Sequence, residues 1–493
     1  MKALLIHPPW LRFFGGSLSI APMALNAIAC YVRRETPHVD IDVYNADHCD
    51  KLDPLFSSHS YATLHGQYLK RLNDFNDPIW QAVARTIDTL KPDVVGISAM
   101  TASFPSALNV ARIVKNIDPG IQVLMGGKHP SALPVATLQH LAIDVVAIGE
   151  GEETFKELLE HGHDRHRVHG IAFRDGDGGI VRTPARPPVA DINTLPIPVF
   201  KSAINRYDFE KGINLASYKW RIIGARGCPF KCVYCASDKR IRYRSPEHIM
   251  AEIDHVIDRF GIRTFRFEDD SFSLNRKRAL DLCARMAERG ITWECNTRVD
   301  LVDRQLVAAM KTSGCELVWL GIETGSDATA RRINKQISHD MVLDAIRLFK
   351  QHHIMVCGYF MIGFPWERKA DMLQTLALIK ALPLDDFELN LTTPLPGTEL
   401  FETLVREGRI DVATEDWSRY HQGSPDMNFS RYPDDVWKAI VMDLTRQASR
   451  LHRHRMVIKT VKLFLNDPVV TFKRASNRLR DSRYWDIVRK LLS

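Results

Sequence analysis

Three cysteines lie close together in the middle of the chain, directly after a strand-like segment. Cys228, Cys232 and Cys235 have C-x3-C-x2-C spacing and follow the run 220–223. Three nearby thiolates can converge on one metal centre, and soft sulfur ligands select iron–sulfur clusters or zinc. A structural zinc site needs four protein ligands, whereas three leave one position open. The spacing therefore predicts a cluster with an open iron, or else a zinc knuckle completed by Cys295 or a histidine.

Alternating strand and helix patterns surround this cysteine motif. Ser245-Pro246 is a good helix start, and the apolar residues that follow it recur at helical spacing. The strand-like runs are 220–223, 264–267, 292–296, 317–321, 355–361 and 387–391. Six such units predict a partial (β/α)6 barrel, with its site at the C-terminal ends of the strands. The cysteine motif follows the first strand and should therefore lie in that site.

Polar side chains follow three of the other predicted barrel strands. Asp269, Asp270 and Ser271 come after the second strand, Arg298 after the third, and Glu323 after the fourth. Carboxylates suit ammonium and hydroxyl groups, and a guanidinium suits a carboxylate. Strand ends of a parallel barrel meet at one rim, so we expect these side chains to lie near the cysteines.

Residues 1–165 show a similar alternation, with strand-like runs at 2–7, 39–44, 94–98, 122–125 and 145–148. This pattern predicts a doubly wound parallel sheet that binds ligands beyond the carboxyl ends of its strands. Glycine lets a backbone approach a ligand closely, and hydroxyls and free amides can bond polar groups. The residues of interest at these ends are Met100, Thr101, Ser103, Gly126, Gly127, Gly149 and Glu150.

Together, these motifs resemble the cobalamin-binding branch of the radical S-adenosylmethionine (SAM) family. The cysteine spacing is similar to that of the superfamily. The stretches 92–98, 126–130 and 149–152 resemble the attached cobalamin-binding domain. The resemblance covers about residues 1–405. It points to the branch that includes the anaerobic magnesium-protoporphyrin ester cyclase and cobalamin-dependent methyltransferases of carbon and phosphorus.

The resemblance implies three cofactors and their ligands. Cys228, Cys232 and Cys235 would hold a [4Fe–4S] cluster, whose fourth iron is chelated by SAM. The implied SAM contacts are Tyr234, Asp269, Asp270, Ser271, Arg298 and Glu323. The implied cobalamin contacts are Met100, Thr101, Ser103, Gly126, Gly127, Gly149 and Glu150. The D-x-H-x-x-G signature is absent after the first strand, and His129 is most simply a loop histidine.

The implied activity is methyl transfer to an unactivated carbon or phosphorus centre, through a 5′-deoxyadenosyl radical and methylcobalamin. Such a centre has no lone pair for polar methyl transfer, so the cofactors must carry the difficult chemistry. One alternative is cyclisation or rearrangement with the same cofactors and no methyl transfer. A methylthiotransferase is disfavoured because the first domain lacks an extra cysteine cluster. A non-catalytic cobalamin- or redox-sensing protein is the alternative from another class.

The 493 residues are enough for two or three domains. We predict a cobalamin-binding domain at 1–165, a hairpin and proline-rich connector at 166–215, the barrel at 216–405, and a basic helical region at 406–493. No run of eighteen uncharged apolar residues is present, the N-terminus does not resemble a signal peptide, and six of the nine cysteines are scattered. These features predict a cytoplasmic protein. Residues 49–75 interrupt the pattern, and no role is predicted for them.

The basic charge is concentrated near the C-terminus. From residue 446 onward there are thirteen Lys and Arg residues against three Asp and Glu, while the whole chain carries +7. We expect a long basic helix at 434–462 and a short amphipathic segment at 485–492, forming a helical cap. Peripheral contact with an anionic membrane is the alternative. Nucleic-acid binding is not expected, because aromatic residues do not interleave the basic ones. The expected partners are a small-molecule substrate and a reducing donor such as flavodoxin or ferredoxin.

Overall fold

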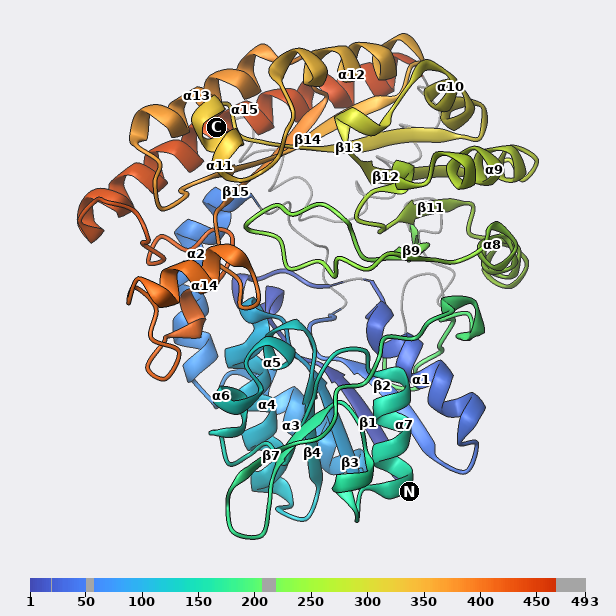
Figure 1. Cartoon of the computed structure of the whole chain (residues 1–493), viewed down its shortest axis with the longest axis vertical. Helices are drawn as coiled ribbons and strands as arrows, with labels where there is room; N and C mark the ends of the chain where they lie inside the picture. The colour runs from blue at the N-terminus through green and yellow to red at the C-terminus, as the bar shows by residue number, and fades with distance from the viewer. Residues whose placement is uncertain (19, 50–56, 206–218, 467–493) are drawn as a thin grey trace.

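Two predominantly parallel sheets organise the chain and form the lower and upper lobes in Figure 1. The structure is a computed structural model that describes residues 1–18, 20–49, 57–205 and 219–466. The first sheet has the strand order β2-β1-β3-β4-β5-β6-β7. Its strands are β1 (Lys2–His7), β2 (Asp40–Asn45), β3 (Val94–Ser98), β4 (Gln122–Gly126), β5 (Val145–Ala147), β6 (Ile171–Arg174) and β7 (Ile180–Arg182).

Helices cover both faces of the first sheet, as predicted. Along β1, Leu5 packs with the apolar residues of α1 and α7, whereas Leu4 belongs to the cluster that includes residues of α3 and α4. This alternation follows from the period of two along a strand. The helices of this lobe are α1 (Met23–Glu35), α3 (Pro78–Leu90), α4 (Phe104–Ile117), α5 (Lys128–Ala132), α6 (Pro134–Leu138) and α7 (Glu152–His161). The predicted doubly wound architecture is confirmed.

The hairpin predicted in the connector is present, but it extends the first sheet. β6 pairs antiparallel with β5, and β7 pairs antiparallel with β6. The chain therefore crosses to the second lobe after Arg182, through a proline-rich stretch. The domain boundaries proposed from the sequence remain predictions.

The second sheet has six parallel strands in the order β15-β14-β13-β12-β11-β8, which confirms the predicted partial barrel. Its strands are β8 (Trp220–Ile222), β11 (Thr264–Phe267), β12 (Thr292–Thr297), β13 (Cys315–Glu323), β14 (Met355–Ile362) and β15 (Asp386–Leu391). Its helices are α8 (Pro246–Phe260), α9 (Arg276–Ala287), α10 (Arg304–Thr312), α11 (Asp327–Arg332), α12 (His339–Gln351), α13 (Lys369–Ala381) and α14 (Glu399–Arg406). Between β8 and α8, the short strands β9 (Ala225–Arg226) and β10 (Arg242–Tyr243) pair antiparallel.

Local sequence explains the ends of α8. The Ser245 hydroxyl accepts a hydrogen bond from the backbone N–H of His248, and Pro246 occupies the first turn. Gly261 ends the helix in the left-handed conformation, with its N–H bonded to the carbonyl of Ile257. One face of the helix is buried against the barrel through Ile249, Ile253 and Val256.

The open edge of the barrel, at β15, is covered by two segments from distant parts of the chain. The backbone N–H of Leu391 donates to the carbonyl of Gln422 at 2.8 Å. The Ser58 hydroxyl, in the first turn of α2 (Ser58–Asn73), donates to the carbonyl of Leu389. An uncovered strand edge is a site of aggregation. Residues 57–73 of the interruption therefore have a structural role that the sequence did not indicate.

The long C-terminal helix predicted at 434–462 is α15 (Asp434–Asn466), which contacts α2, α13 and β15. The amphipathic segment predicted at 485–492 lies outside the described residues, as does most of the basic tail. Among the helices that the structure describes, none is both long enough and apolar enough to cross a membrane.

Replacing Gly423 by Ala should loosen the cover over β15. An added Cβ would lie 2.4 Å from the Tyr61 Cβ and 2.8 Å from the carbonyl oxygen of Ser58, both in α2. We expect the free energy of unfolding to fall by about 1–3 kcal/mol. Chemical denaturation of the purified variant measures this change.

Gly66→Ala is the matched control, because a Cβ at this exposed position of α2 meets no atom within 4 Å. It should be neutral or stabilise the protein by roughly 0.5–1 kcal/mol. Equal stability of the two variants would show that the contact between Gly423 and α2 does not hold the cover in place.

Candidate active site

The cysteine loop, residues 227–241, is closed at its base by β9 and β10. Gly227 has φ +99°, and a Cβ there would lie 2.4 Å from the carbonyl oxygen of Arg240, so only glycine fits. The backbone N–H of Cys228 donates to the carbonyl of Asp238 at 2.7 Å. These contacts bring the two ends of the loop together and fix the first cysteine at its base.

The middle of the cysteine loop is anchored to the barrel rim. The N–H of Val233 donates to the carbonyl of Ile333 at 3.3 Å, just after α11. The carbonyl of Val233 accepts from the N–H of Leu400 at 2.9 Å, in the first turn of α14. The second and third cysteines, which flank this residue, are therefore held at the ends of the barrel strands, as predicted.

The three thiols of the loop are free, partly exposed and within electrostatic reach of one another. Burial raises the pKa of Cys228, an effect opposed by the N–H of Phe230, and negative charge on the other two sulfurs would raise it further. Each thiolate of a cluster can bind a different iron atom, so the sulfurs need not meet at one point. The donor set therefore fits a cluster.

The zinc alternative lacks its ligands. In the described ranges, no three His, Cys, Asp or Glu side chains form a group that could hold a single metal ion. Cys295 is fully buried in β12, beside Cys315, and burial raises its pKa well above the ordinary value. It is a core side chain.

Asp269 supports the segment that leads into the cysteine loop. Its Oδ1 accepts hydrogen bonds from the backbone N–H groups of Gly224 at 2.6 Å and Ala225 at 3.0 Å. The side chain is buried, and burial raises its pKa to about 6, against the opposing charge of Arg278. Its Oδ2 has no hydrogen-bond partner among the described residues. One oxygen thus braces the loop, and the other is buried 3.9 Å from the Arg278 guanidinium.

The two residues after Asp269 occupy different environments. Asp270 is exposed and accepts a hydrogen bond from Ser237 at 3.1 Å, and the Ser237 hydroxyl lies 3.4 Å from the Cys235 sulfur. Ser271 is buried, with its hydroxyl 3.4 Å from that of Thr297. The structure therefore brings Asp270 to the cysteine loop and places Ser271 within the barrel rim.

Arg298 reaches the cysteine loop from the end of β12. Its guanidinium lies 3.6 Å from the centre of the Phe230 ring and forms two 2.9 Å hydrogen bonds with Asp300. It also donates to the carbonyl of Lys335 at 3.2 Å. The arginine is therefore fixed by stacking and by carboxylate pairing at once.

Glu323 ends β13 in the left-handed conformation, with φ +73°. Its Oε1 lies 2.9 Å from the Lys335 ammonium, and both side chains are buried. Burial raises the pKa of Tyr234 well above its ordinary value, and the Glu323 charge adds to this effect. A strained backbone is tolerated where the surrounding structure fixes it, and such positions cluster at functional sites. The charge of Glu323 therefore acts on Tyr234.

Lys335 and Glu367 are two buried charged residues that sequence analysis did not single out as site residues. A lysine just after a short helix normally faces solvent, and no local pattern marks Lys335 as buried. Glu367 accepts hydrogen bonds from the N–H groups of Gly363 at 2.7 Å and Phe364 at 3.0 Å, and burial raises its pKa to about 7. It shapes the loop that places Phe364 beside Tyr234, with ring centres 6.0 Å apart.

The inward face of the barrel sheet is polar along its strands. Arg266 donates to Glu268 at 2.9 Å, to Glu294 at 2.8 Å and to the Tyr359 hydroxyl at 3.2 Å. The Tyr359 ring stacks on Trp319 with centres 4.7 Å apart. These residues come from four neighbouring strands and alternate with the apolar residues beneath the helices.

The predicted cobalamin contacts lie at the carboxyl edge of the first sheet. Met100 is 51% exposed, whereas Thr101 and Ser103 are buried, and the Ser103 hydroxyl accepts from the N–H of Met100. Gly127 has φ +111°, and a Cβ there would lie 2.5 Å from the carbonyl oxygen of Ala99. Gly126 is half-buried, and a Cβ at Gly149 would meet no atom within 4 Å. Glycine at 127 is therefore required by the close approach of the Ala99 backbone, whereas Gly149 leaves open space at this edge that a large cofactor can approach.

Glu150 connects the two lobes. Its carboxylate accepts from Arg226 at 2.7 Å and from Arg242 at 2.8 Å, the residues of β9 and β10 that flank the cysteine loop. The N–H of Val189 donates a third hydrogen bond at 2.8 Å. Burial alone would raise the pKa of Glu150, but the hydrogen bonds from Arg242 and Arg226 lower it to about 2. This carboxylate is therefore engaged in an interlobe ion pair.

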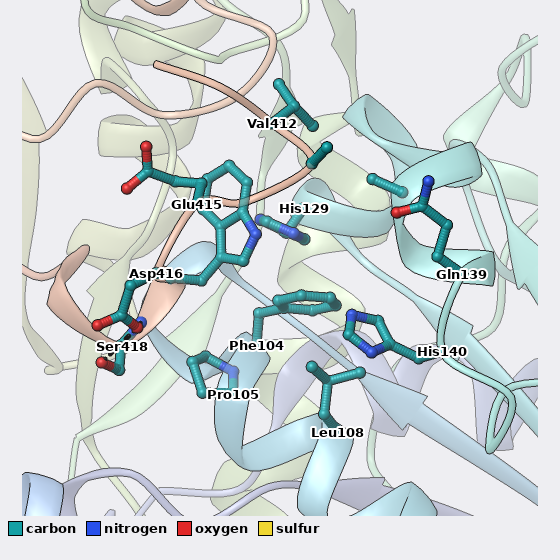
Figure 2. Close-up of a pocket in the computed structure, with 13 residues that line it drawn as sticks. Phe104, Pro105, Leu108, His129, Gln139, His140, Val412, Glu415, Asp416 and Ser418 are labelled. Carbon is teal, nitrogen blue, oxygen red and sulfur yellow. Dashed lines mark hydrogen bonds between the residues drawn. The ribbon is translucent and has the colours of Figure 1, made fainter. Parts of the chain in front are cut away.

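His129 lines a cavity of about 230 Å³, shown in Figure 2. Its ring lies 3.9 Å from that of Phe104 and 4.7 Å from that of Trp417, measured between centres, and its Nδ1 lies 3.4 Å from the Thr101 hydroxyl. Burial lowers its pKa to about 3, so it stays neutral. The remaining lining residues are Pro105, Leu108, Ala136, Gln139, His140, Val412, Ala413, Glu415, Asp416 and Ser418.

Comparisons with known proteins agree with this arrangement. Residues 222–379 match the family model of the radical SAM superfamily, and residues 67–159 match that of the B12 binding domain. The chain is 32% identical to the uncharacterized methyltransferase PH0819 of Pyrococcus horikoshii over 370 residues, which are 73% of this chain and 79% of that protein. It is 29% identical to the anaerobic magnesium-protoporphyrin IX monomethyl ester cyclase of Rubrivivax gelatinosus, over 75% of this chain and 67% of that protein.

The fold is also similar to that of OxsB, a cobalamin-dependent SAM radical enzyme, with a TM-score of 0.65 and 15% identity over 97% of this chain and 75% of that one. A parallel sheet that matches a B12 binding domain and a partial barrel that carries three cysteines define a class of protein. The chain belongs to the cobalamin-binding branch of the radical SAM family, whose cofactors are a [4Fe–4S] cluster, SAM and cobalamin. The family includes methyltransferases and cyclases, which act on small molecules and need a reductant.

Replacing Glu150 by Gln should weaken the interlobe junction. Two charge-assisted hydrogen bonds are lost or weakened, and we expect the free energy of unfolding at pH 7 to fall by about 2–3 kcal/mol. The folded pKa of about 2 lies below the ordinary value of 4.5, so this stabilisation is fully present above pH 4.5 and is lost as the pH falls toward 2. The difference in the free energy of unfolding between the wild type and Glu150→Gln should therefore be constant from pH 5 to 8 and shrink below pH 4.5.

Glu153→Gln is the control, because Glu153 pairs with Arg186 at 3.0 Å but is 44% exposed. Its effect should be about 0–1 kcal/mol. Denaturant unfolding across this pH range gives the comparison. A difference for Glu150→Gln that grows on acidification would contradict the assigned ion pair.

Proposed function

We propose that the protein is a cobalamin-dependent radical SAM methyltransferase that acts on an unactivated carbon or phosphorus centre. The observation that carries this proposal is the shared position of the two cofactor sites. Glu150, at the carboxyl edge of the cobalamin-type sheet, bonds both strands that flank the cysteine loop. One reaction centre could therefore face both cofactors. The relative from Pyrococcus horikoshii, which is named as a methyltransferase, favours methyl transfer.

In this proposal Cys228, Cys232 and Cys235 hold the cluster. When bound, the cluster and SAM together supply a radical that removes hydrogen from the substrate, and cobalamin supplies the methyl carrier. Arg298 presents a guanidinium to the carboxylate of SAM. Asp269 braces the backbone that leads into the cysteine loop. Tyr234 lies beside Phe364 and offers an apolar contact to the adenine. The protein's contribution is to orient these groups and exclude water.

The polar inward face of the barrel is the proposed substrate wall. Trp319 and Tyr359 form a continuous aromatic surface across β13 and β14, and Asn296 and the Tyr359 hydroxyl add hydrogen-bonding groups at its edge. Arg266 is neutralised by Glu268 and Glu294. A substrate with a planar apolar part and peripheral polar groups suits such a wall better than a highly charged one.

The second candidate is oxidative cyclisation or rearrangement with the same cofactors. It is favoured by the similarity to the cyclase of Rubrivivax gelatinosus, which extends over three quarters of this chain. The two reactions use the same protein groups up to the substrate radical. They differ only in whether a methyl group reaches the product.

The products formed from SAM should distinguish these reactions. For a methyltransferase, anaerobically reconstituted protein with substrate should release both 5′-deoxyadenosine and S-adenosylhomocysteine, and label from methyl-labelled SAM should appear in the product. Liquid chromatography with mass spectrometry measures all three. The substrate is sought by incubating a library of candidate compounds with the methyl-labelled SAM.

Cys232→Ala is the control for this experiment. It should lose at least 100-fold in SAM cleavage together with iron content, because one of three cluster ligands is gone. 5′-Deoxyadenosine without S-adenosylhomocysteine or label would favour cyclisation. Turnover that survives in Cys232→Ala would rule out both candidates.

Replacing Lys335 by Met should weaken SAM binding at least 10-fold, because the Lys335 ammonium holds the Glu323 carboxylate in place. Removing the lysine alone leaves a buried carboxylate unpaired, at a cost of about 3–5 kcal/mol in stability. The double variant Lys335→Met/Glu323→Gln should regain much of the stability but not the affinity. Calorimetric titration with SAM and thermal unfolding separate the two effects.

Lys350→Met is the matched control. Lys350 pairs with Asp385 at a half-buried position on α12, away from the strand ends. It should leave SAM affinity unchanged. Full affinity in the double variant would mean that Glu323 and Lys335 only support the fold.

A further inference from the structure

The cysteine loop exposes cations that pair with no carboxylate among the residues that the structure describes. Arg226 and Arg242 turn inward to Glu150, whereas Lys231, Lys239 and Arg240 are exposed. Lys128, at the start of α5 in the first lobe, is also exposed and reaches the same loop. We name Lys128, Lys231, Lys239 and Arg240 the loop cation patch. Within the described ranges, no carboxylate lies within ion-pair distance of any of these four side chains.

The patch lies directly over the backbone that carries the thiols. The Lys239 ammonium donates to the carbonyl of Phe230 at 2.9 Å, and the Lys128 ammonium lies 3.4 Å from the carbonyl oxygen of Ala236. The Lys231 carbonyl accepts from Asn334 at 3.1 Å, so its backbone is fixed to the barrel rim. The charges are therefore held at a defined place beside three partly exposed cysteines.

Nearby acidic groups do not neutralise the patch. Asp238 accepts from the N–H of Arg240 and lies 3.7 Å from Arg242, and Asp270 is bonded to Ser237. The chain before residue 446 carries a small net negative charge, so three cations on one loop and a fourth beside it, none of them in a described ion pair, are a local exception. A patch of one sign raises the encounter rate with a partner of opposite sign and orients it.

Resting on the proposed function, we propose that the loop cation patch docks an acidic one-electron donor protein of the flavodoxin or ferredoxin class. The electron balance is simple. The donor loses one electron, the cysteine-bound cluster gains one, and no bond or proton is transferred. A cofactor next to the loop is closest to a partner seated on the loop itself. The patch is small, which does not favour a lipid surface or a nucleic acid.

The test reverses three charges and leaves Lys239, which bonds the loop backbone, unchanged. The variant Lys128→Glu/Lys231→Glu/Arg240→Glu is compared with Lys70→Glu/Arg85→Glu/Lys277→Glu, an equal charge change at exposed positions of α2, α3 and α9. A purified flavodoxin and a purified ferredoxin serve as probes. Stopped-flow absorbance measures cluster reduction, and calorimetric titration measures binding to the reconstituted protein.

We expect the patch variant to lose at least 10-fold in affinity and in the second-order rate of cluster reduction by at least one donor. The wild-type rate should fall as salt is raised, and the control variant should match the wild type. Reduction by dithionite, the resulting paramagnetic signal and dithionite-driven SAM cleavage should be the same in all three proteins. These dithionite measurements show that the cluster and the site are intact.

Equal rates for the patch and control variants would overturn the inference. The inference would also be overturned if the patch variant bound flavodoxin and ferredoxin as well as the wild type does, but lost binding to anionic phospholipid vesicles or to a single-stranded oligonucleotide. Failure of the proposed function would look different. The wild-type protein would then show no SAM cleavage with dithionite, whatever the donor proteins do.

Discussion

A carboxylate shared by two arginines links the two lobes of this molecule at the cysteine loop, and Glu152 adds a second bond to one of these arginines. Glu150 belongs to the end of a strand in the first sheet, and Arg226 and Arg242 belong to the two strands that close the cysteine loop. Each charge-assisted hydrogen bond of this kind contributes about 1.5–3 kcal/mol. Because Glu150 bonds both ends of the loop, it fixes the loop and the domain contact with one interaction. The relative position of the proposed cofactor sites therefore depends on it.

The opposite side of the barrel depends on a second interlobe contact. β15 is an edge strand, and a partial barrel that left it open would expose unpaired backbone groups. The chain covers this edge with α2, inserted between β2 and α3 of the first lobe, and with the segment around Gln422 that follows the barrel. The two lobes are thus joined at the strands that close the cysteine loop and at the last strand of the barrel. Contacts at two separate places suit a site in which two large cofactors must face each other.

Local patterns in the sequence predicted the elements because those patterns are caused by local physics. The strands from Thr264–Phe267 to Asp386–Leu391 follow runs of buried side chains, and α8 begins and ends where Ser245 and Gly261 satisfy its backbone. The cysteine spacing predicted the loop because ligands for one cluster must be close in sequence or in space. Pairings between distant segments left no such signal. Glu150 is 76 residues from Arg226, and Ser58 is 331 residues from Leu389.

The same reasoning explains why Lys335 was missed and what it does. Nothing in its neighbourhood in the sequence marks it as buried, yet its ammonium neutralises Glu323 and its carbonyl fixes Arg298. Arg298 in turn is paired with Asp300, so each charge at this part of the rim already has an opposite partner. The proposed ligand, SAM, presents an ammonium and a carboxylate together. It can exchange partners with these pairs without leaving a buried charge unpaired, which is the costly outcome for ions inside a protein. A rim of matched pairs therefore suits a zwitterionic ligand, whereas a rim with one unpaired sign would select a simple anion or cation.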